Sequence, residues 1–168
     1  MPTKVLFFDF VDTIADVSAV PRESLKAYAQ KCRAIAEGRE AFSKPEFDGK
    51  WIGAHIPSVA CDALVQLRRM VQIVVLTNSP LAFVTEISRR SAVEWDAILC
   101  AEMFKQCKPS PTVYRGACEL MRVEPSEAVM VAAHPFDVAG AEACGLKGFL
   151  LGNGGLLSDL AQHLSNGF

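Results

Sequence analysis

Near the start of the chain lies the stretch VLFFDFVDTI, residues 5–14. Its four apolar residues, 5–8, predict a buried strand that brings Asp9 to a polar turn. A carboxylate at such a place can act as a covalent nucleophile, because the strand fixes its position and the turn exposes it. Two residues later stands Val11, where a second acid could have donated a proton. The stretch therefore predicts a nucleophile without an adjacent acid.

The composition is typical of a globular protein with a substantial core. The chain has 168 residues, of which 51% are hydrophobic and 21% are charged, which fits one domain with at most a small insertion. The net charge is -2 and no basic stripe is visible, so we expect neither nucleic acid nor a membrane surface as a partner. No apolar run approaches the ~20 residues of a membrane span, and no signal peptide is evident.

The cysteines are scattered and form no Cys-x-x-Cys pair. Without a secretory pattern, we expect reduced thiols that pack as small hydrophobic side chains, in a cytoplasmic protein. The six positions are Cys32, Cys61, Cys100, Cys107, Cys118 and Cys144.

Short apolar runs alternate with helical patterns along the chain. The predicted strands are 5–8, 71–76, 97–99, 128–132 and 148–151. The predicted core helices are 58–70, 81–90, 110–121, 136–144 and 156–164. Nearly continuous apolar strands are typical of a parallel sheet that is covered on both faces. The sequence therefore predicts an α/β protein with a doubly wound parallel sheet and an active site at the carboxyl ends of its strands.

Residues 16–57 interrupt this alternation. They contain a predicted helix, 21–37, followed by an irregular stretch with Phe42, Phe47 and Trp51. Because the region falls between the first two strands, we expect a small, mainly helical cap or lid above the strand ends. The predicted domains are a core of residues 1–15 and 58–168 and a cap of residues 16–57.

Three further polar segments follow predicted strands or precede a helix. They are LTNS at 76–79, KPSPTVY at 108–114 and AAHPFD at 132–137. In a doubly wound sheet these segments converge with Asp9 on one crevice.

Together the four segments resemble the motifs of the haloacid dehalogenase superfamily, which occur in this order. The resemblance covers about three-quarters of the chain and implies a Rossmann-like core with an aspartate nucleophile. The residues that it assigns to the motifs are Asp9, Thr13, Thr77, Asn78, Lys108 and Asp137.

The departures from the superfamily pattern favour one branch. Phosphatases of the superfamily carry an acid at the place of Val11, and it protonates a poor leaving group. They also hold Mg²⁺ with a second acid in the fourth motif, where this chain has Ala133. Halide leaves without a proton, so a dehalogenase needs neither group. The run at 131–137 with His134, and Tyr114 six positions after Lys108, also resemble the type II 2-haloacid dehalogenase-like branch.

The resemblance implies hydrolysis of a small 2-haloacid to a 2-hydroxy acid. Asp9 displaces the halide and forms an ester, which water hydrolyses with the help of His134 or Asp137, while Lys108 replaces a metal as the local electrophile. Thr13 belongs to the same catalytic set. The residues expected to contact the substrate are Val11, Thr77, Asn78 and Tyr114. No cofactor is expected, and a small carboxylate is the expected partner.

Two alternatives stay open. A Mg²⁺-dependent phosphatase with a degraded acid would hold the ion with Asp9, the Val11 carbonyl and Asp137. A non-catalytic binding module is the other alternative, because the cap is shorter than is usual in dehalogenases.

The sequence does not show whether a cap arginine receives the halide. It also does not show whether the aromatic residues of the predicted lid, Phe42, Phe47 and Trp51, form the contact of a homodimer. The cap arginines are Arg22, Arg33 and Arg39.

Overall fold

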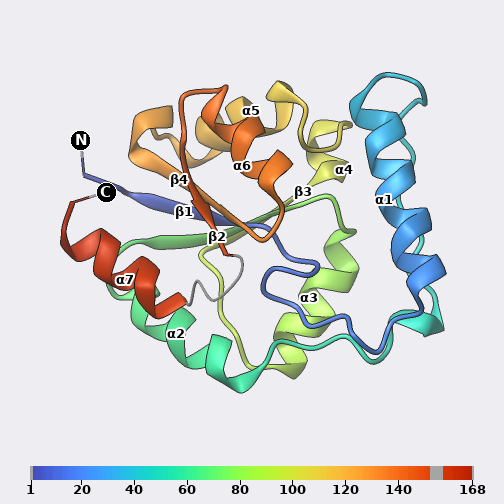
Figure 1. Ribbon diagram of the computed structural model, residues 1–168, viewed down its shortest axis with the longest axis horizontal. Helices are drawn as coiled ribbons and strands as arrows, with labels where there is room; N and C mark the ends of the chain where they lie inside the picture. The colour runs from blue at the N-terminus through green and yellow to red at the C-terminus, as the bar shows by residue number, and fades with distance from the viewer. Residues whose placement is uncertain (1, 152–156, 168) are drawn as a thin grey trace.

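One parallel sheet of five strands forms the centre of the protein, with the order β3-β2-β1-β4-β5 (Figure 1). The computed structural model describes residues 2–151 and 157–167. The strands are β1 (Val5–Phe8), β2 (Gln72–Thr77), β3 (Ala97–Cys100), β4 (Ala128–Ala132) and β5 (Lys147–Leu150). The strand β1 lies in the middle, where Phe8 pairs with Val75 of β2 and Val131 of β4.

Helices cover both faces of the sheet. The α-helices are α1 (Arg22–Ala36), α2 (Ser58–Arg68), α3 (Leu81–Arg90), α4 (Ala101–Phe104), α5 (Pro111–Met121), α6 (Pro135–Glu142) and α7 (Leu157–Ser165). Leu6 and Phe8 belong to one buried cluster with residues of α2, α3 and α7. Val5 and Phe7 belong to the opposite cluster with residues of α5 and α6. Because alternate side chains of a strand point to opposite faces, a strand with apolar residues at every position can serve both clusters.

The predicted α/β class and doubly wound sheet are confirmed, and the differences concern the ends of elements. The helix predicted over 58–70 ends at Arg68, and the following strand begins at Gln72 and continues to Thr77. The short helix α4 and two 3-10 turns, Gly49–Trp51 and Pro125–Glu127, were not predicted because they carry too few residues for a periodic pattern. Position 156 of the helix predicted over 156–164 lies outside the described residues.

The region between β1 and β2 carries α1, which stands beside the sheet (Figure 1). After α1 the chain returns along α3, where Phe47 and Trp51 pack on Phe83 with ring centroids 4.3 and 5.6 Å away. In residues 2–151 and 157–167, no helix is long and apolar enough to cross a membrane.

Candidate active site

Asp9 lies directly after the central strand, at the carboxyl edge of the sheet. Its amide donates to the carbonyl of Val131 (2.9 Å), so the backbone continues the pairing with β4 for one more residue. Its side chain is buried, and both carboxylate oxygens have partners. Thr13 Oγ1 donates to Oδ2 (2.9 Å), and Lys108 Nζ donates to Oδ1 (2.8 Å). The carboxylate is therefore held in one orientation.

Thr13 connects the two loops that follow β1 and β4. While its hydroxyl donates to Asp9, the same oxygen accepts from the amide of Ala133 (3.0 Å). Because one hydroxyl serves as donor and acceptor, the position of the nucleophile is tied to the β4 loop.

Lys108 lies between two acids. Its ammonium donates to Asp9 Oδ1 (2.8 Å) and to Asp137 Oδ2 (3.3 Å), and its side chain is 1% exposed. Asn78 fixes the backbone that carries it, since Asn78 Oδ1 accepts from Lys108 N (2.7 Å) and Nδ2 donates to Lys108 O (3.1 Å). The amide of Asn78 thus holds the lysine loop in place.

Tyr114 lies behind Asp137, on the side away from the cavity, and binds it. Its buried hydroxyl lies 3.1 Å from the carbonyl oxygen and 3.3 Å from Oδ1 of Asp137, so one proton is shared by two acceptors. Gly140 of α6 makes room for this ring, because a Cβ there would lie 2.9 Å from the tyrosine oxygen. We did not identify Gly140 from the sequence, in which a helical glycine has no distinctive pattern.

The charges of this cluster shift two ionisation equilibria. Burial acts to lower the pKa of Lys108, but the charges of Asp137 and Asp9 outweigh it, so the pKa of Lys108 lies above its usual value. Burial raises the pKa of Asp137, and the neighbouring ammonium offsets part of that rise. Lys108 is therefore a fixed positive charge at neutral pH.

The site offers few acidic side chains to a divalent cation. Among the residues that the structure describes, no group of three His, Cys, Asp or Glu side chains could hold a metal ion. Asp9 and Asp137 supply two carboxylates, and the ammonium of Lys108 already donates to both. A Mg²⁺ ion between them would meet that charge, and Ala133 adds no further oxygen ligand.

His134 stands at the rim, in the last position before α6. Its ring stacks on Phe136 with centroids 5.3 Å apart and an interplanar angle of 12°. Asp12 faces it, with Oδ2 4.0 Å from Nε2, which is an ion-pair distance rather than a hydrogen bond. Asp12 adopts the left-handed conformation at φ 61°, which places its exposed side chain at the rim and away from Asp9.

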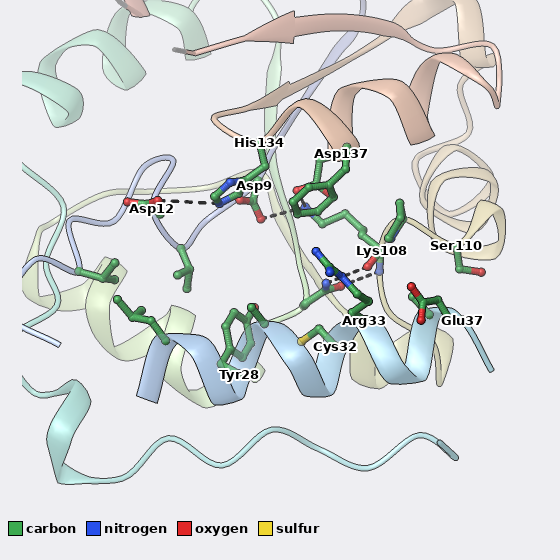
Figure 2. A pocket seen from close by; sticks show the side chains of 18 of the residues that line it. Asp9, Asp12, Tyr28, Cys32, Arg33, Glu37, Lys108, Ser110, His134 and Asp137 are labelled. Carbon is green, nitrogen blue, oxygen red and sulfur yellow. Dashed lines mark hydrogen bonds and ion pairs between the residues drawn. The ribbon is translucent and has the colours of Figure 1, made fainter. Parts of the chain in front are cut away.

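A cavity of about 580 Å³ opens above Asp9 (Figure 2). Its floor includes Asp9, Lys108 and Asp137, and Val11 and Asn78 also line it. The opposite wall is one face of α1, formed by Leu25, Tyr28, Ala29, Cys32, Arg33, Ala36 and Glu37. Of the three cap arginines, Arg33 lines the cavity, whereas Arg39 pairs with Glu37 at 2.6 Å. Within residues 2–151 and 157–167, Arg33 itself has no ion pair or hydrogen bond from its side chain.

A helix over residues 21–37 in a cap above the strand ends was predicted, but the α1 residues that line the cavity were not named as site residues, although their signal is in the sequence. The lining positions on α1 recur at intervals of three and four residues, which is the repeat of one face of a helix. The lid aromatics lie elsewhere: Phe47 and Trp51 pack on α3, and Phe42 packs with a small cluster around Cys107.

Two residues expected to contact the substrate lie below the cavity surface. Thr77 is fully buried, and its hydroxyl accepts from the amide of Ser79 (3.0 Å). Tyr114 is fully buried behind Asp137. Their positions suit residues that support the site rather than residues that touch a ligand.

Residues 29–145 match the family of haloacid dehalogenase-like hydrolases. The match covers more than half of the chain, and its span includes the second, third and fourth motifs. The chain therefore belongs to this family of hydrolases.

Two curated relatives are phosphatases. The plasmid-encoded phosphoglycolate phosphatase of Cupriavidus necator is 26% identical over 97 residues, which cover 56% of this chain and 42% of the relative. The N-acylneuraminate-9-phosphatase of Rattus norvegicus is 32% identical over 87 residues, which cover 50% of this chain and 35% of the relative. The matched part is thus less than half the length of either relative.

Solved structures with the same fold include dehalogenases. The L-2-haloacid dehalogenase of Xanthobacter autotrophicus matches with a TM-score of 0.73 and 19% identity, over 99% of this chain and 84% of that one. A defluorinating L-2-haloacid dehalogenase matches with a TM-score of 0.79 and 17% identity, over 97% and 95%. An enzyme of the same family from Bacteroides thetaiotaomicron, solved with magnesium and inorganic phosphate, matches with a TM-score of 0.69 and 15% identity, over 94% and 98%. At these identities, the similarity establishes the fold.

Proposed function

We propose that this hydrolase uses Asp9 as a covalent nucleophile on the halogen-bearing carbon of a 2-halo acid, without a metal. The observation that carries the proposal is the ammonium of Lys108 between two buried acids, with apolar residues at positions 11 and 133. A phosphoryl group brings two negative charges and an alkoxide leaving group that needs a proton. A halo acid brings one negative charge, and its halide leaves as a stable anion.

In the first step, an oxygen of Asp9 attacks the carbon next to the substrate carboxylate. A carbon–oxygen bond forms as the carbon–halogen bond breaks, and halide departs with the bonding electron pair. Thr13 and Lys108 hold the nucleophile in line, which lowers the entropic cost of reaching the transition state. The product is an ester between Asp9 and the 2-hydroxy acid.

In the second step, water adds to the Cγ atom of Asp9 and gives a proton to His134 or Asp137. The tetrahedral intermediate collapses, the 2-hydroxy acid leaves with a proton, and the carboxylate of Asp9 is restored with one oxygen from water. Burial raises the pKa of Asp137, which makes this carboxylate a stronger base than an exposed aspartate. His134 lines the cavity and is the second candidate.

Arg33 is the cap residue suited to receive an anion. Its side chain rises from α1 into the cavity (Figure 2), whereas the charge of Lys108 is already shared by two acids. A guanidinium can hold the substrate carboxylate or the departing halide. Neither Arg22 nor Arg39 is among the residues that line this cavity in the described part of the chain.

The test is halide release from 2-bromopropionate in the presence of a metal chelator. We expect turnover by the wild-type protein and by Asp62→Asn, a control at an exposed position on α2, and none by Asp9→Asn. Halide release that is equal in wild-type protein and Asp9→Asn, or absent from both, would contradict the proposal.

A phosphatase is the second candidate, because the two curated relatives above are phosphatases. A panel of phosphate esters, assayed with Mg²⁺ and with chelator, separates the candidates. Phosphate release that requires Mg²⁺ and Asp9 would favour the phosphatase over the dehalogenase.

A further inference from the structure

The cavity above Asp9 is much larger than a short halo acid requires. A halogenated three-carbon acid has six non-hydrogen atoms. Even if each took the roughly 30 Å³ that a water molecule occupies in the liquid, the acid would need about 180 Å³. The cavity measures about 580 Å³, so about two-thirds of it would stay unfilled.

The unfilled part has an apolar wall made of small side chains. Ala29 and Ala36 both face the cavity from α1, and Cys32 lies between them. The two alanines are seven residues apart, which corresponds to roughly 10 Å along a helix. Pro109 and Phe136 line the cavity as well. Small residues on one face of a helix leave a groove along its axis where larger side chains would fill the space.

The charges that the proposed reaction uses lie at the reaction centre and at Arg33, while Asp12, His134 and Glu37 also line the cavity. One anionic head group is all that the reaction requires, and the rest of the substrate can lie against the carbon and sulfur of Ala29, Cys32, Ala36, Pro109 and Phe136. Burial of a polar tail against this wall would leave its hydrogen bonds unmade.

We propose that the preferred substrate is a 2-halo acid with an extended aliphatic chain of about six to eight carbons, which lies along α1 between Ala29 and Ala36. This inference rests on the proposed dehalogenation at Asp9. It assigns Ala29 and Ala36 as the residues that set the accepted chain length.

The chain length can be tested with 2-bromopropionate, 2-bromohexanoate and 2-bromooctanoate. Each methylene group that leaves water gains about twofold to fourfold in kcat/KM, so we expect 2-bromohexanoate to exceed 2-bromopropionate by about 10- to 60-fold. A kcat/KM that falls as the chain is lengthened would overturn the inference.

Substitutions on α1 locate the effect. Ala36→Leu fills the groove, and we expect it to reduce the ratio of kcat/KM for the long acid over the short acid by at least about 10-fold. Ala27→Leu is the matched control, because Ala27 is exposed on α1 and does not line the cavity. The control is expected to keep the wild-type ratio. An unchanged ratio in Ala36→Leu, or an equal loss in both variants, would overturn the assignment.

Binding of non-halogenated acids separates this inference from the proposed chemistry. We expect octanoate to bind wild-type protein at least about 10-fold more tightly than propionate in calorimetric titrations, and Ala36→Leu to remove that difference. If binding follows this pattern and no halo acid is turned over, the apolar groove is supported and dehalogenation is refuted. If halide is released but octanoate binds no more tightly than propionate, dehalogenation stands and the groove is refuted.

Discussion

Ion pairs lie at both the amino edge of the sheet, where the strands begin, and the carboxyl edge, where they end. The two sets of pairs differ in burial and in the balance of positive and negative charge. At the amino edge, Lys4 Nζ lies 2.7 Å from Glu127 Oε1, and the lysine side chain is 55% exposed. At the carboxyl edge, the lysine side chain is 1% exposed, and Lys108 has two acids as partners, Asp9 and Asp137. The first arrangement is a balanced pair whose lysine lies largely in water while its glutamate is 10% exposed, and the second is a buried cluster with an excess of negative charge.

The difference in burial indicates different roles for the two sets of ion pairs. An exposed pair gains little free energy because water and salt screen it. A buried cluster costs desolvation energy, and it persists where its geometry is needed. The carboxyl edge therefore holds the part of the molecule that is organised for reactivity, whereas the amino edge ties β1 to the turn before β4.

The largest expected effect comes from removal of the nucleophile. Asp9→Asn keeps the shape of the side chain but removes the attacking oxygen anion, so we expect halide release to fall by at least about 1,000-fold. Steady-state halide assays measure this loss. If Asp9→Asn kept more than a tenth of wild-type activity, Asp9 at the carboxyl edge would not be the nucleophile.

A matched pair of lysine substitutions compares the two edges directly. Lys108→Met leaves two buried acids without their cation, and we expect a loss of about 3 to 5 kcal/mol in the free energy of unfolding. That corresponds to a drop of about 6 to 20 °C in melting temperature, whereas Lys4→Met should change it by at most about 4 °C. Thermal and urea unfolding measure both variants. Equal losses in the two variants would remove the contrast between the edges.

A smaller effect is expected from the tyrosine below Asp137. Tyr114→Phe removes a donor to a buried charged group, so we expect a loss of about 1 to 3 kcal/mol in stability. Because Asp137 is a candidate base for the second step, we also expect ester hydrolysis to slow by about 10-fold while the first halide burst is unchanged. Rapid-quench measurements of the burst and of the steady state separate the two steps. A smaller burst would place Tyr114 in the first step instead.

The smallest effect belongs to the amino edge and depends on pH. The hydrogen bond from Lys4 lowers the pKa of Glu127, with a second contribution from the amide of Glu124. A depressed carboxyl pKa contributes stability that is fully present above the unfolded value of about 4.3 and is lost as the pH falls through the folded value. We expect Glu127→Gln to be less stable than wild type at pH 6 and nearly equal to it at pH 3, in urea unfolding. A gap that stays constant over this range would show that the ionisation of Glu127 contributes nothing.

The parts of the molecule that the sequence could predict are those that follow from strand topology. Asp9 and Lys108 lie in loops and Asp137 lies in the first turn of α6, and the rule that parallel strands share one carboxyl edge placed the three segments together. The continuous apolar character of residues 5–8 predicted burial on both faces, which the structure confirms.

Side-chain partners across elements were not predictable in the same way. Asn78 lines the cavity, as a residue expected to contact the substrate should, but the sequence did not predict that its side-chain amide also binds the backbone of Lys108. Phe47 and Trp51 were considered as parts of a lid, but they do not line the cavity and pack on Phe83 of α3 and behind Tyr28 of α1. Such choices depend on which surfaces meet after the helices pack, and a single sequence does not contain that information.

The proposed reaction requires that the carboxylate of Asp9, and not water, attacks the substrate carbon. Isotope labelling tests this most directly, by reaction with 2-bromohexanoate in ¹⁸O-water with a metal chelator present. After a single turnover we expect ¹⁶O in the new hydroxyl group of the product. We also expect ¹⁸O in the peptide that carries Asp9, detected by mass spectrometry. A product that carries ¹⁸O from the first turnover, with Asp9 unlabelled, would contradict it.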